Sequence, residues 1–247
     1  MTKVLLSFIL LLAVCIHPVR AQFCNMQKGT KLYYKTVDME KKTTKIDSSY
    51  IAGIYNKEKY TLIKQLNYDK SLEAITHDSV QSILFVYESP DLTRVILMSG
   101  EAMKTQIQQA VAAELHKTKD AQNEKKLQKL QKQIQAEGSL SIPLKTNAKQ
   151  GETFLECNFS LKIMFIKMTC TLKDGKYEGY ETIGTPVGTY HCLKVSYAVK
   201  SVMMLVSETA YVTEWYAPNI GLVKSEERSK KGKIISSQIL TSIKQPA

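Results

Sequence analysis

Short stretches rich in Tyr, Ile, Leu, Val and Thr, separated by polar turns, dominate the chain up to Gly100 and again after Gly138. Such residues favour extended strands, and short links favour antiparallel pairing between consecutive strands. An antiparallel sheet of about eleven strands is too large to stay flat, so it must curl, close or split. The sequence therefore predicts a mainly β protein whose curved antiparallel sheet forms a half-barrel or a barrel. The strands expected before Gly100 are 30–37, 48–55, 59–68, 82–88 and 92–98.

The second half of the chain continues the pattern. Apolar residues alternate between Phe159 and Phe165, which predicts one half-buried strand within 154–172. Asp174-Gly175 is a favourable hairpin turn, and the links 218–219 and 229–232 also predict turns. The further strands expected are 177–184, 189–199, 203–208, 210–217, 221–227 and 233–243.

A different composition fills 101–137. This stretch holds good helix formers and no Gly or Pro before Gly138. Its central part, 116–126, is almost entirely polar, so we expect one or two helices inserted in the β domain and packing a narrow face on the sheet. The alternative is an amphipathic membrane-binding segment, because lysines flank the apolar positions. The apolar positions at helical spacing are Met103, Ile107, Val111 and Leu115, and then Leu127, Leu130 and Ile134.

The first 21 residues have the order of a secretory signal. Lys3 precedes an apolar run from Val4 to Val14, and Ala21 offers a small residue at the cleavage position. We therefore predict a signal peptide at 1–21 and a single β-rich domain at 22–247. A lipoprotein signal with Cys15 as the lipidated residue is the alternative, although Val14 is bulky for that peptidase. No second apolar run approaches the length of a membrane span, so we expect no transmembrane segment in the mature chain.

The chain is basic, with 34 Lys and Arg residues against 23 Asp and Glu residues. Only Arg20, Arg94 and Arg228 are arginines, and the lysines are scattered through the polar positions. Nucleic-acid recognition relies on clustered arginine, often with stacking aromatics, so no nucleic-acid partner is expected. A solvated lysine-rich surface, with weak attraction to anionic lipid or acidic polymers, fits better.

Four cysteines remain after the predicted cleavage: Cys24, Cys157, Cys170 and Cys192. An even number in an exported protein favours disulfides, and four cysteines allow three pairings. Cys24 with Cys192 and Cys157 with Cys170 is the pairing considered first, although the segment between Cys157 and Cys170 offers no turn residue to reverse the chain.

Nothing in the sequence predicts a catalytic, cofactor-binding or metal-binding residue. His77, His116 and His191 have no metal-ligand spacing, and no nucleophile elbow or phosphate loop occurs. We therefore predict that the protein is not an enzyme. A secreted hydrolase with dispersed carboxylates is the less favoured alternative.

Three segments in the second half resemble a family of secreted Gram-negative proteins of unknown function, the 3108-like (TapB-like) group. They are GTPVGTYHCLKV (184–195), TEWYAPNIGLVKSEE (213–227) and GKIISSQIL (232–240). Segment 23–38 resembles the family's N-terminal strand, and Gly151-Glu152 resembles a turn of the family. The resemblance implies an exported envelope β protein, in the periplasm or on the outer surface, distantly similar to the half-barrels of lipoprotein carriers.

Large aromatic residues in these segments, Trp215, Tyr216 and Tyr190, are expected either in the core or along a ligand groove. The leading functional hypothesis is an exported, non-catalytic envelope protein without a cofactor. It would bind a lipid or another apolar or amphipathic ligand, or an envelope protein partner. The alternative is a structural envelope component that uses 101–137 as a docking element.

Overall fold

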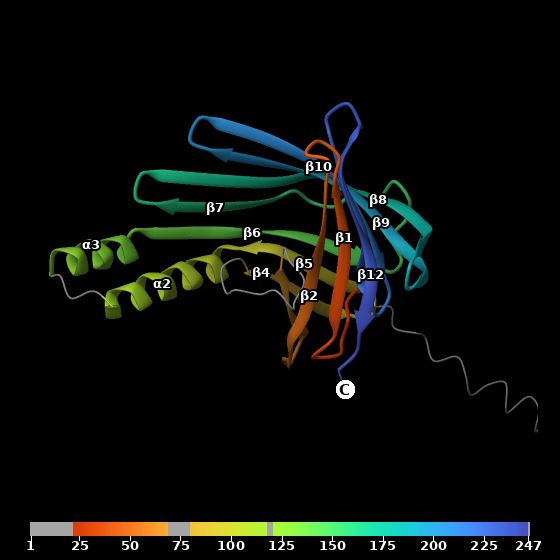
Figure 1. Ribbon diagram of the computed structural model, residues 1–247, viewed down its shortest axis with the longest axis horizontal. Coiled ribbons are helices and arrows are strands. Elements are labelled where there is room, and N and C mark those ends of the chain that lie inside the picture. The colour runs from red at the N-terminus through yellow and green to blue at the C-terminus, as the bar shows by residue number, and fades with distance from the viewer. Residues whose placement is uncertain (1–21, 69–79, 118–120, 247) are drawn as a thin grey trace, which may run out of the picture.

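In the computed structural model, which describes residues 22–68, 80–117 and 121–246, the strands form one closed antiparallel barrel (Figure 1). Each strand pairs with its neighbour in the sequence, and β1 closes the ring by pairing with β12. The prediction of a curved antiparallel sheet of about eleven strands is confirmed, with twelve strands in the described ranges. They are β1 (Lys31–Asp38), β2 (Thr43–Asn56), β3 (Thr61–Tyr68), β4 (Val80–Ser89), β5 (Leu92–Ser99), β6 (Ile134–Lys145), β7 (Cys157–Ile163), β8 (Ile166–Thr185), β9 (Gly188–Met203), β10 (Val206–Ala217), β11 (Gly221–Arg228) and β12 (Ile234–Lys244).

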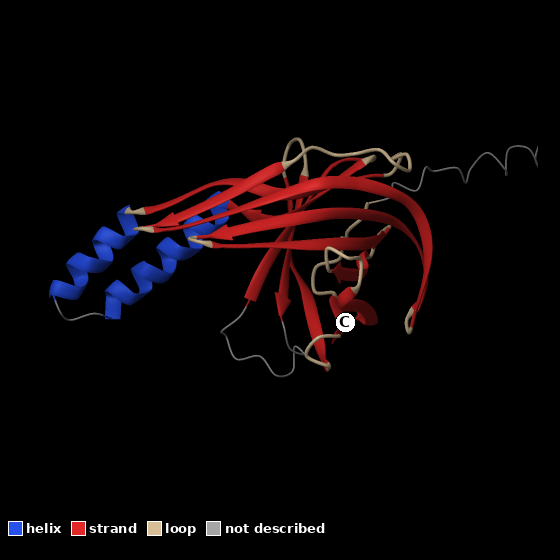
Figure 2. Cartoon of the chain, turned by 90° about the horizontal axis from the view of Figure 1, so that it is seen from above, coloured by secondary structure: helices blue, strands red, loops and turns tan. Residues whose placement is uncertain are grey.

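The helical insertion lies between β5 and β6. It forms α2 (Gly100–Lys117) and α3 (Ala121–Lys132), which lie side by side at one end of the molecule (Figures 1 and 2). α2 packs against β6 and α3, and Val111 of its apolar face is buried. The helix was expected to reach 137, but Ile134 is the first residue of β6 and pairs with Ile163. In this strand position the Ile134 side chain is buried, at 2% exposed, while the backbone pairs with β7.

Two of the predicted strands, one within 154–172 and one at 203–208, each contain a chain reversal in the structure. The chain reverses at Met164 and Phe165 between β7 and β8, and at Met204 and Leu205 between β9 and β10. Met164 and Met204 adopt left-handed backbone conformations, with φ of 55° in both cases. The expectations of one strand within 154–172 and of a strand at 203–208 are therefore wrong, because residues other than glycine make these tight turns. Such turns cannot be predicted from the local sequence, because two-residue hairpin turns usually carry Asn, Asp or Gly.

The opposite error occurs at Asp174-Gly175, where we expected a turn. β8 runs through this position, and its pairing with β9 shifts register between Lys173 and Lys176. The left-handed residue Asp174, with φ of 56°, serves a bulge in this long strand rather than a chain reversal. The turns predicted at 218–219 and 229–232 are confirmed.

The core has an inner and an outer part. Inward-facing side chains of the strands form the main cluster, which includes Ile51, Ile63, Leu144 and Leu193. A second cluster forms on the other face of the sheet, because Trp215 alternates with the inward residues of β10. Its buried members are Ile183, Cys192, Trp215, Ala217 and Val223. None of the helices in the described ranges is both long and apolar enough to cross a membrane.

Candidate functional site

A cavity of about 790 Å³ is the candidate site. Nine elements contribute to its wall, among them strands from both ends of the chain, because β1 and β12 are neighbours in the closed ring. The volume lies within the range of about 300–1,000 Å³ that is usual for small-ligand sites. Its lining residues are Tyr34, Lys45, Asp47, Ser48, Ser49, Gln65, Asn67, Tyr68, Ile83, Leu84, Phe85, Val95, Ile96, Leu97, Met98, Ser99, Ala102, Met103, Gln106, Glu214, Tyr216, Leu222 and Gln238.

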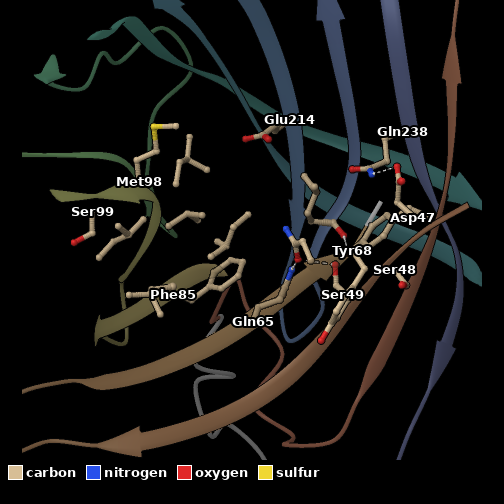
Figure 3. A pocket seen from close by; sticks show the side chains of 18 of the residues that line it. Asp47, Ser48, Ser49, Gln65, Tyr68, Phe85, Met98, Ser99, Glu214 and Gln238 are labelled. Atoms are coloured by element: carbon tan, nitrogen blue, oxygen red, sulfur yellow. Dashed lines mark hydrogen bonds between the residues drawn. The ribbon is translucent and has the colours of Figure 1, made fainter. Parts of the chain in front are cut away.

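One side of the cavity is apolar. Phe85 of β4 and Val95 of β5 face it, and Figure 3 shows Phe85 and Met98 on the same side. A register shift between Ile96 and Met98 marks a β-bulge, which re-aims side chains so that consecutive residues of β5 reach the cavity. Met103 in the first turns of α2 adds a flexible side chain to this wall. The apolar side therefore combines a sheet surface with the beginning of the helical insertion.

The opposite side is polar and centres on Asp47 of β2. Its Oδ2 accepts hydrogen bonds from the Thr36 hydroxyl and from Nε2 of Gln238, the latter at 3.2 Å (Figure 3). Its Oδ1 lies 3.0 Å from Nζ of Lys45, yet it accepts no hydrogen bond from the described residues. Since Asp47 is only 9% exposed, an acceptor without a hydrogen bond is held at the cavity wall.

A second polar group lies on β2 and β3. Asn67 Oδ1 accepts hydrogen bonds from Gln65 Nε2 at 2.9 Å and from the Ser49 hydroxyl at 2.8 Å. These inward positions would carry apolar residues in an ordinary barrel interior. Ser49 lies on the same face of β2 as Ile51, and Gln65 and Asn67 lie on the same face of β3 as Ile63. The barrel interior therefore changes from a packed apolar core to a polar wall along these two strands.

A buried carboxyl group on β10 completes the wall. Glu214 Oε2 accepts a hydrogen bond of 2.8 Å from the Tyr216 hydroxyl, and the Tyr197 hydroxyl also bonds to this carboxyl group. Burial raises the pKa of Glu214 and outweighs both hydrogen bonds, which lower it. Burial and the nearby Glu214 also raise the pKa of Tyr197 and Tyr216 well above the ordinary range.

Replacing Glu214 with glutamine is expected to remove a pH-dependent loss of stability. Because its folded-state pKa is raised, Glu214 favours folding most below the ordinary glutamate pKa of about 4.3, and this contribution is lost as the pH rises through the raised pKa. In urea unfolding at pH 4, 6 and 8, the free energy of unfolding of Glu214→Gln should therefore increase relative to that of the wild type as the pH rises.

Glu226→Gln is the matched control for this experiment. Burial raises the pKa of Glu226, but the hydrogen bonds and charges of Lys224 and Arg228 outweigh that effect and leave the pKa lowered. The Glu226 contribution is thus present above about pH 4.3 and is lost as the pH falls through the lowered pKa. The two variants should show opposite trends, and parallel trends would contradict the assignment of Glu214.

The three aromatic residues singled out in the sequence are separated by the fold. Tyr216 is buried and lines the cavity, next to Glu214. Trp215 points to the outer cluster, where its Nε1 donates a 3.0 Å hydrogen bond to Glu181 Oε2. Tyr190 packs against that outer cluster and against a third buried cluster formed by Leu32, Tyr34 and Leu240. Only Tyr216 can therefore touch a ligand in the cavity.

The four cysteines carry free thiols in the structure, so the expected disulfides are not formed. Cys24 belongs to the inner cluster and Cys192 to the outer one. The β7–β8 register pairs Cys157 with Leu172, and Cys170 with Phe159, so the two cysteines are diagonal neighbours. Diagonal Cα atoms lie about 7–8 Å apart, beyond the usual disulfide range of about 4.4–6.8 Å.

Two of these thiols, Cys24 and Cys192, are also poor nucleophiles. Burial raises the pKa of Cys24 to about 12. Burial and the nearby Glu181 raise the pKa of Cys192 to about 12 as well. A reactive cysteine needs a lowered pKa, so at neutral pH neither thiol supplies a thiolate.

His191 stacks on Tyr180, with ring centroids 5.0 Å apart, and does not line the cavity. His77 and the side chain of His116 lie outside the described residues, as does the expected signal peptide. Within the described ranges, no three His, Cys, Asp or Glu side chains come together as metal ligands. The carboxyl groups that do line the cavity, Asp47 and Glu214, carry no local sequence signal, because they lie far apart in the chain.

Residues 27–240 match the sequence model of the DUF3108-like family, which confirms the resemblance seen in the sequence. No curated protein matches. A candidate lipoprotein from Parabacteroides distasonis ATCC 8503 has a TM-score of 0.61 at 18% identity, covering 91% of this chain and 99% of that one. A candidate exported protein with a YmcC-like fold from Bacteroides fragilis NCTC 9343 has a TM-score of 0.60 at 17% identity, covering 91% of this chain and 100% of that one. At these identities the similarity concerns the fold.

Proposed function

Because the chain belongs to the DUF3108-like family and its barrel holds a cavity with an apolar and a polar side, we propose that it is an exported, non-catalytic binding protein for an amphipathic ligand. The observation that carries the proposal is the division of the cavity wall between Phe85 and Met98 on one side and Asp47 and Gln238 on the other.

Export to the envelope of a Gram-negative bacterium, in the periplasm or at the outer surface, is supported by two observations. Residues 1–21 have the order of a signal peptide, with Lys3 before an apolar run and Ala21 before Gln22. Two proteins that share the fold are described as a candidate lipoprotein and a candidate exported protein. The mature chain would then be 22–247.

The chemistry of the wall selects the class of ligand. A hydrocarbon part would lie against Phe85, Val95 and Met98, where its burial contributes about 25 cal/mol per Å² of apolar surface removed from water. The polar part would face Asp47 and Glu214, which accept hydrogen bonds. Acceptors of this kind favour a head group that donates hydrogen bonds, such as a hydroxyl or an amine.

Native mass spectrometry of the protein purified from its own host tests the proposal directly. An amphipathic molecule that stays bound through desalting, and is released by organic solvent, would support the binding function. If no ligand copurifies and apolar dyes find no site, the ligand-binding proposal fails, and binding of an envelope protein partner becomes the better account.

Filling the cavity should block binding. We expect Met98→Trp to weaken binding of the apolar fluorescent dye N-phenyl-1-naphthylamine at least tenfold, because the indole would occupy the apolar side of the cavity. Met39→Trp is the matched control, since Met39 is exposed and lies outside the cavity lining, and it should change the affinity less than twofold. Fluorescence titration gives both affinities, and far-UV circular dichroism checks the fold.

Met103→Trp repeats the substitution from α2 on the same cavity wall. If both variants fold and bind the dye as tightly as the wild type does, the dye binds elsewhere. The proposal that this cavity is the ligand site would then be wrong.

A further inference from the structure

Two hairpins end in exposed apolar side chains. The turn between β7 and β8 presents Phe165, which is 78% exposed, and the turn between β9 and β10 presents Leu205, which is fully exposed at 100%. Their neighbours at both turns are also exposed. We call residues 164–166 and 203–206 the paired tips; the members besides Phe165 and Leu205 are Met164, Ile166, Met203, Met204 and Val206.

The two tips lie next to each other. β8 pairs with β9 up to Met168 and Met203, and the Met204 N–H donates a 3.4 Å hydrogen bond to the Lys167 carbonyl. Figure 1 shows the two hairpins reaching away from the barrel in the same direction. Seven apolar residues from two distant parts of the sequence therefore form one protruding surface.

Folding does not require apolar residues at these turns. Two-residue hairpin turns favour Asn, Asp and Gly, which accept left-handed backbone conformations readily. Both tips instead place a methionine there, Met164 and Met204, each with φ of 55°. A methionine in a left-handed conformation strains the turn, and an exposed apolar side chain is unfavourable in water. Their presence at both tips indicates that an apolar surface binds there.

The charge around the tips is positive. Lys162 and Lys167 are exposed and lie directly opposite each other in the β7–β8 register, an arrangement that repels in isolation. Lys200 is exposed on β9, and Glu208 is the one exposed acid close to the second turn on β10. Lysines beside a protruding apolar surface are complementary to anionic lipid headgroups above an apolar interior.

We propose that the paired tips insert into the interfacial layer of a bilayer that carries anionic lipids, with Phe165 and Leu205 as the deepest side chains. The lysines beside the tips favour a bilayer over a protein partner, because a bilayer places anionic headgroups directly above an apolar interior. This surface is separate from the cavity, since none of its residues lines that space. The helical insertion at 101–137, for which membrane binding was the alternative prediction, does not supply this surface, because α2 packs against β6 and α3 and buries Val111.

Cosedimentation with vesicles tests the proposal. The mature full chain should bind vesicles of phosphatidylcholine and phosphatidylglycerol, and the double variant Phe165→Glu/Leu205→Glu should bind at least tenfold more weakly, because transfer of each large apolar side chain is lost. Leu155→Glu/Val187→Glu is the matched control, since Leu155 is 89% exposed, Val187 is also exposed, and both lie outside the tips. It adds the same two charges and should change binding less than twofold.

The lysines have their own test. Lys162→Gln/Lys167→Gln should weaken binding to the anionic vesicles and reduce its dependence on sodium chloride, because fewer screened charges remain. A Phe165→Trp reporter should shift its emission to the blue with these vesicles, while a Tyr60→Trp reporter at another exposed position should not.

Three results would overturn the proposal. The first is that the wild type does not bind vesicles, and the second is that the tip variant and its control bind equally well. The third is that the wild type is a dimer that binds no vesicles and that the tip substitutions convert to a monomer. The last result would identify the tips as a contact between copies. Dye binding in the cavity should be unaffected by the tip variants, and Met98→Trp should keep its vesicle binding, so the two proposals can fail separately.

Discussion

Replacing Gly138 with alanine is expected to lower the free energy of unfolding by about 3–5 kcal/mol. Gly138 lies in β6 opposite Phe159, with φ of +72°, and a Cβ atom there would lie 2.1 Å from the Asn158 carbonyl oxygen. The left-handed conformation alone costs about 1–2 kcal/mol for other residues, and the contact with backbone forces β6 and β7 apart. Urea unfolding followed by far-UV circular dichroism measures the loss.

Two other glycines separate the causes of that loss. Gly232 has φ of +81° but open space around its Cβ position, so Gly232→Ala should cost only the conformational part, about 1–2 kcal/mol. Gly184 has open space and no left-handed backbone, so Gly184→Ala should stay within about 0.5 kcal/mol of the wild type. Equal losses for Gly138→Ala and Gly232→Ala would show that the strands accommodate the added atom and would contradict the steric argument.

Replacing Trp215 with alanine is expected to lower the free energy of unfolding by about 3–5 kcal/mol. Its ring is only 2% exposed in the outer cluster, and it lies between two cations, with Lys194 Nζ 5.1 Å and Lys224 Nζ 4.5 Å from the ring centroid. Alanine would leave a cavity in this cluster and would remove the hydrogen bond to Glu181. Since Trp215 is the only tryptophan, the measurement again uses circular dichroism in urea.

Trp215→Phe keeps an aromatic ring in the cluster but removes the indole N–H and part of the packed ring, so it should cost less than alanine, about 1.5–3 kcal/mol, mainly for the hydrogen bond to a charged group. Tyr60→Ala is the control for loss of an exposed aromatic ring and should stay within about 0.5 kcal/mol. A Trp215→Ala variant as stable as Tyr60→Ala would mean that the outer cluster contributes little, and that the inner core alone stabilises the barrel.

Local patterns in the sequence predict most strands and the helical insertion. Alternating apolar residues and polar links mark the strands, and the stretch without Gly or Pro marks α2 and α3. The predicted end of the insertion is wrong because Ile134 fits a helical face as well as a strand, and only its pairing with Ile163 distinguishes them. The sequence does not predict the hairpin turn at Met164 and Phe165 for a related reason, since its left-handed residue is a methionine rather than a glycine or an asparagine.

The cavity could not be derived from any local pattern. Asp47 and Gln238 hydrogen-bond across the junction of the ring, although 191 positions separate them in the chain. Glu214 alternates with Trp215 like any polar residue of a half-exposed strand, yet it faces inward and is buried. Trp215 and Tyr216 are adjacent in the sequence, but they lie on opposite faces of β10, so Trp215 joins the outer cluster and Tyr216 lines the cavity.

Local residue patterns are enough to predict the mainly β class, the antiparallel order of consecutive strands, the helical insertion and the family, because each of these depends on neighbouring residues or on contiguous motifs. Other features become visible only in the folded chain: the closure of β1 on β12, the free thiols, the polar wall around Asp47 and Glu214, and the meeting of the two apolar tips. Each of these depends on strand register and on the face of the sheet that a side chain occupies. A shift of one residue in register changes both, while the local composition stays the same.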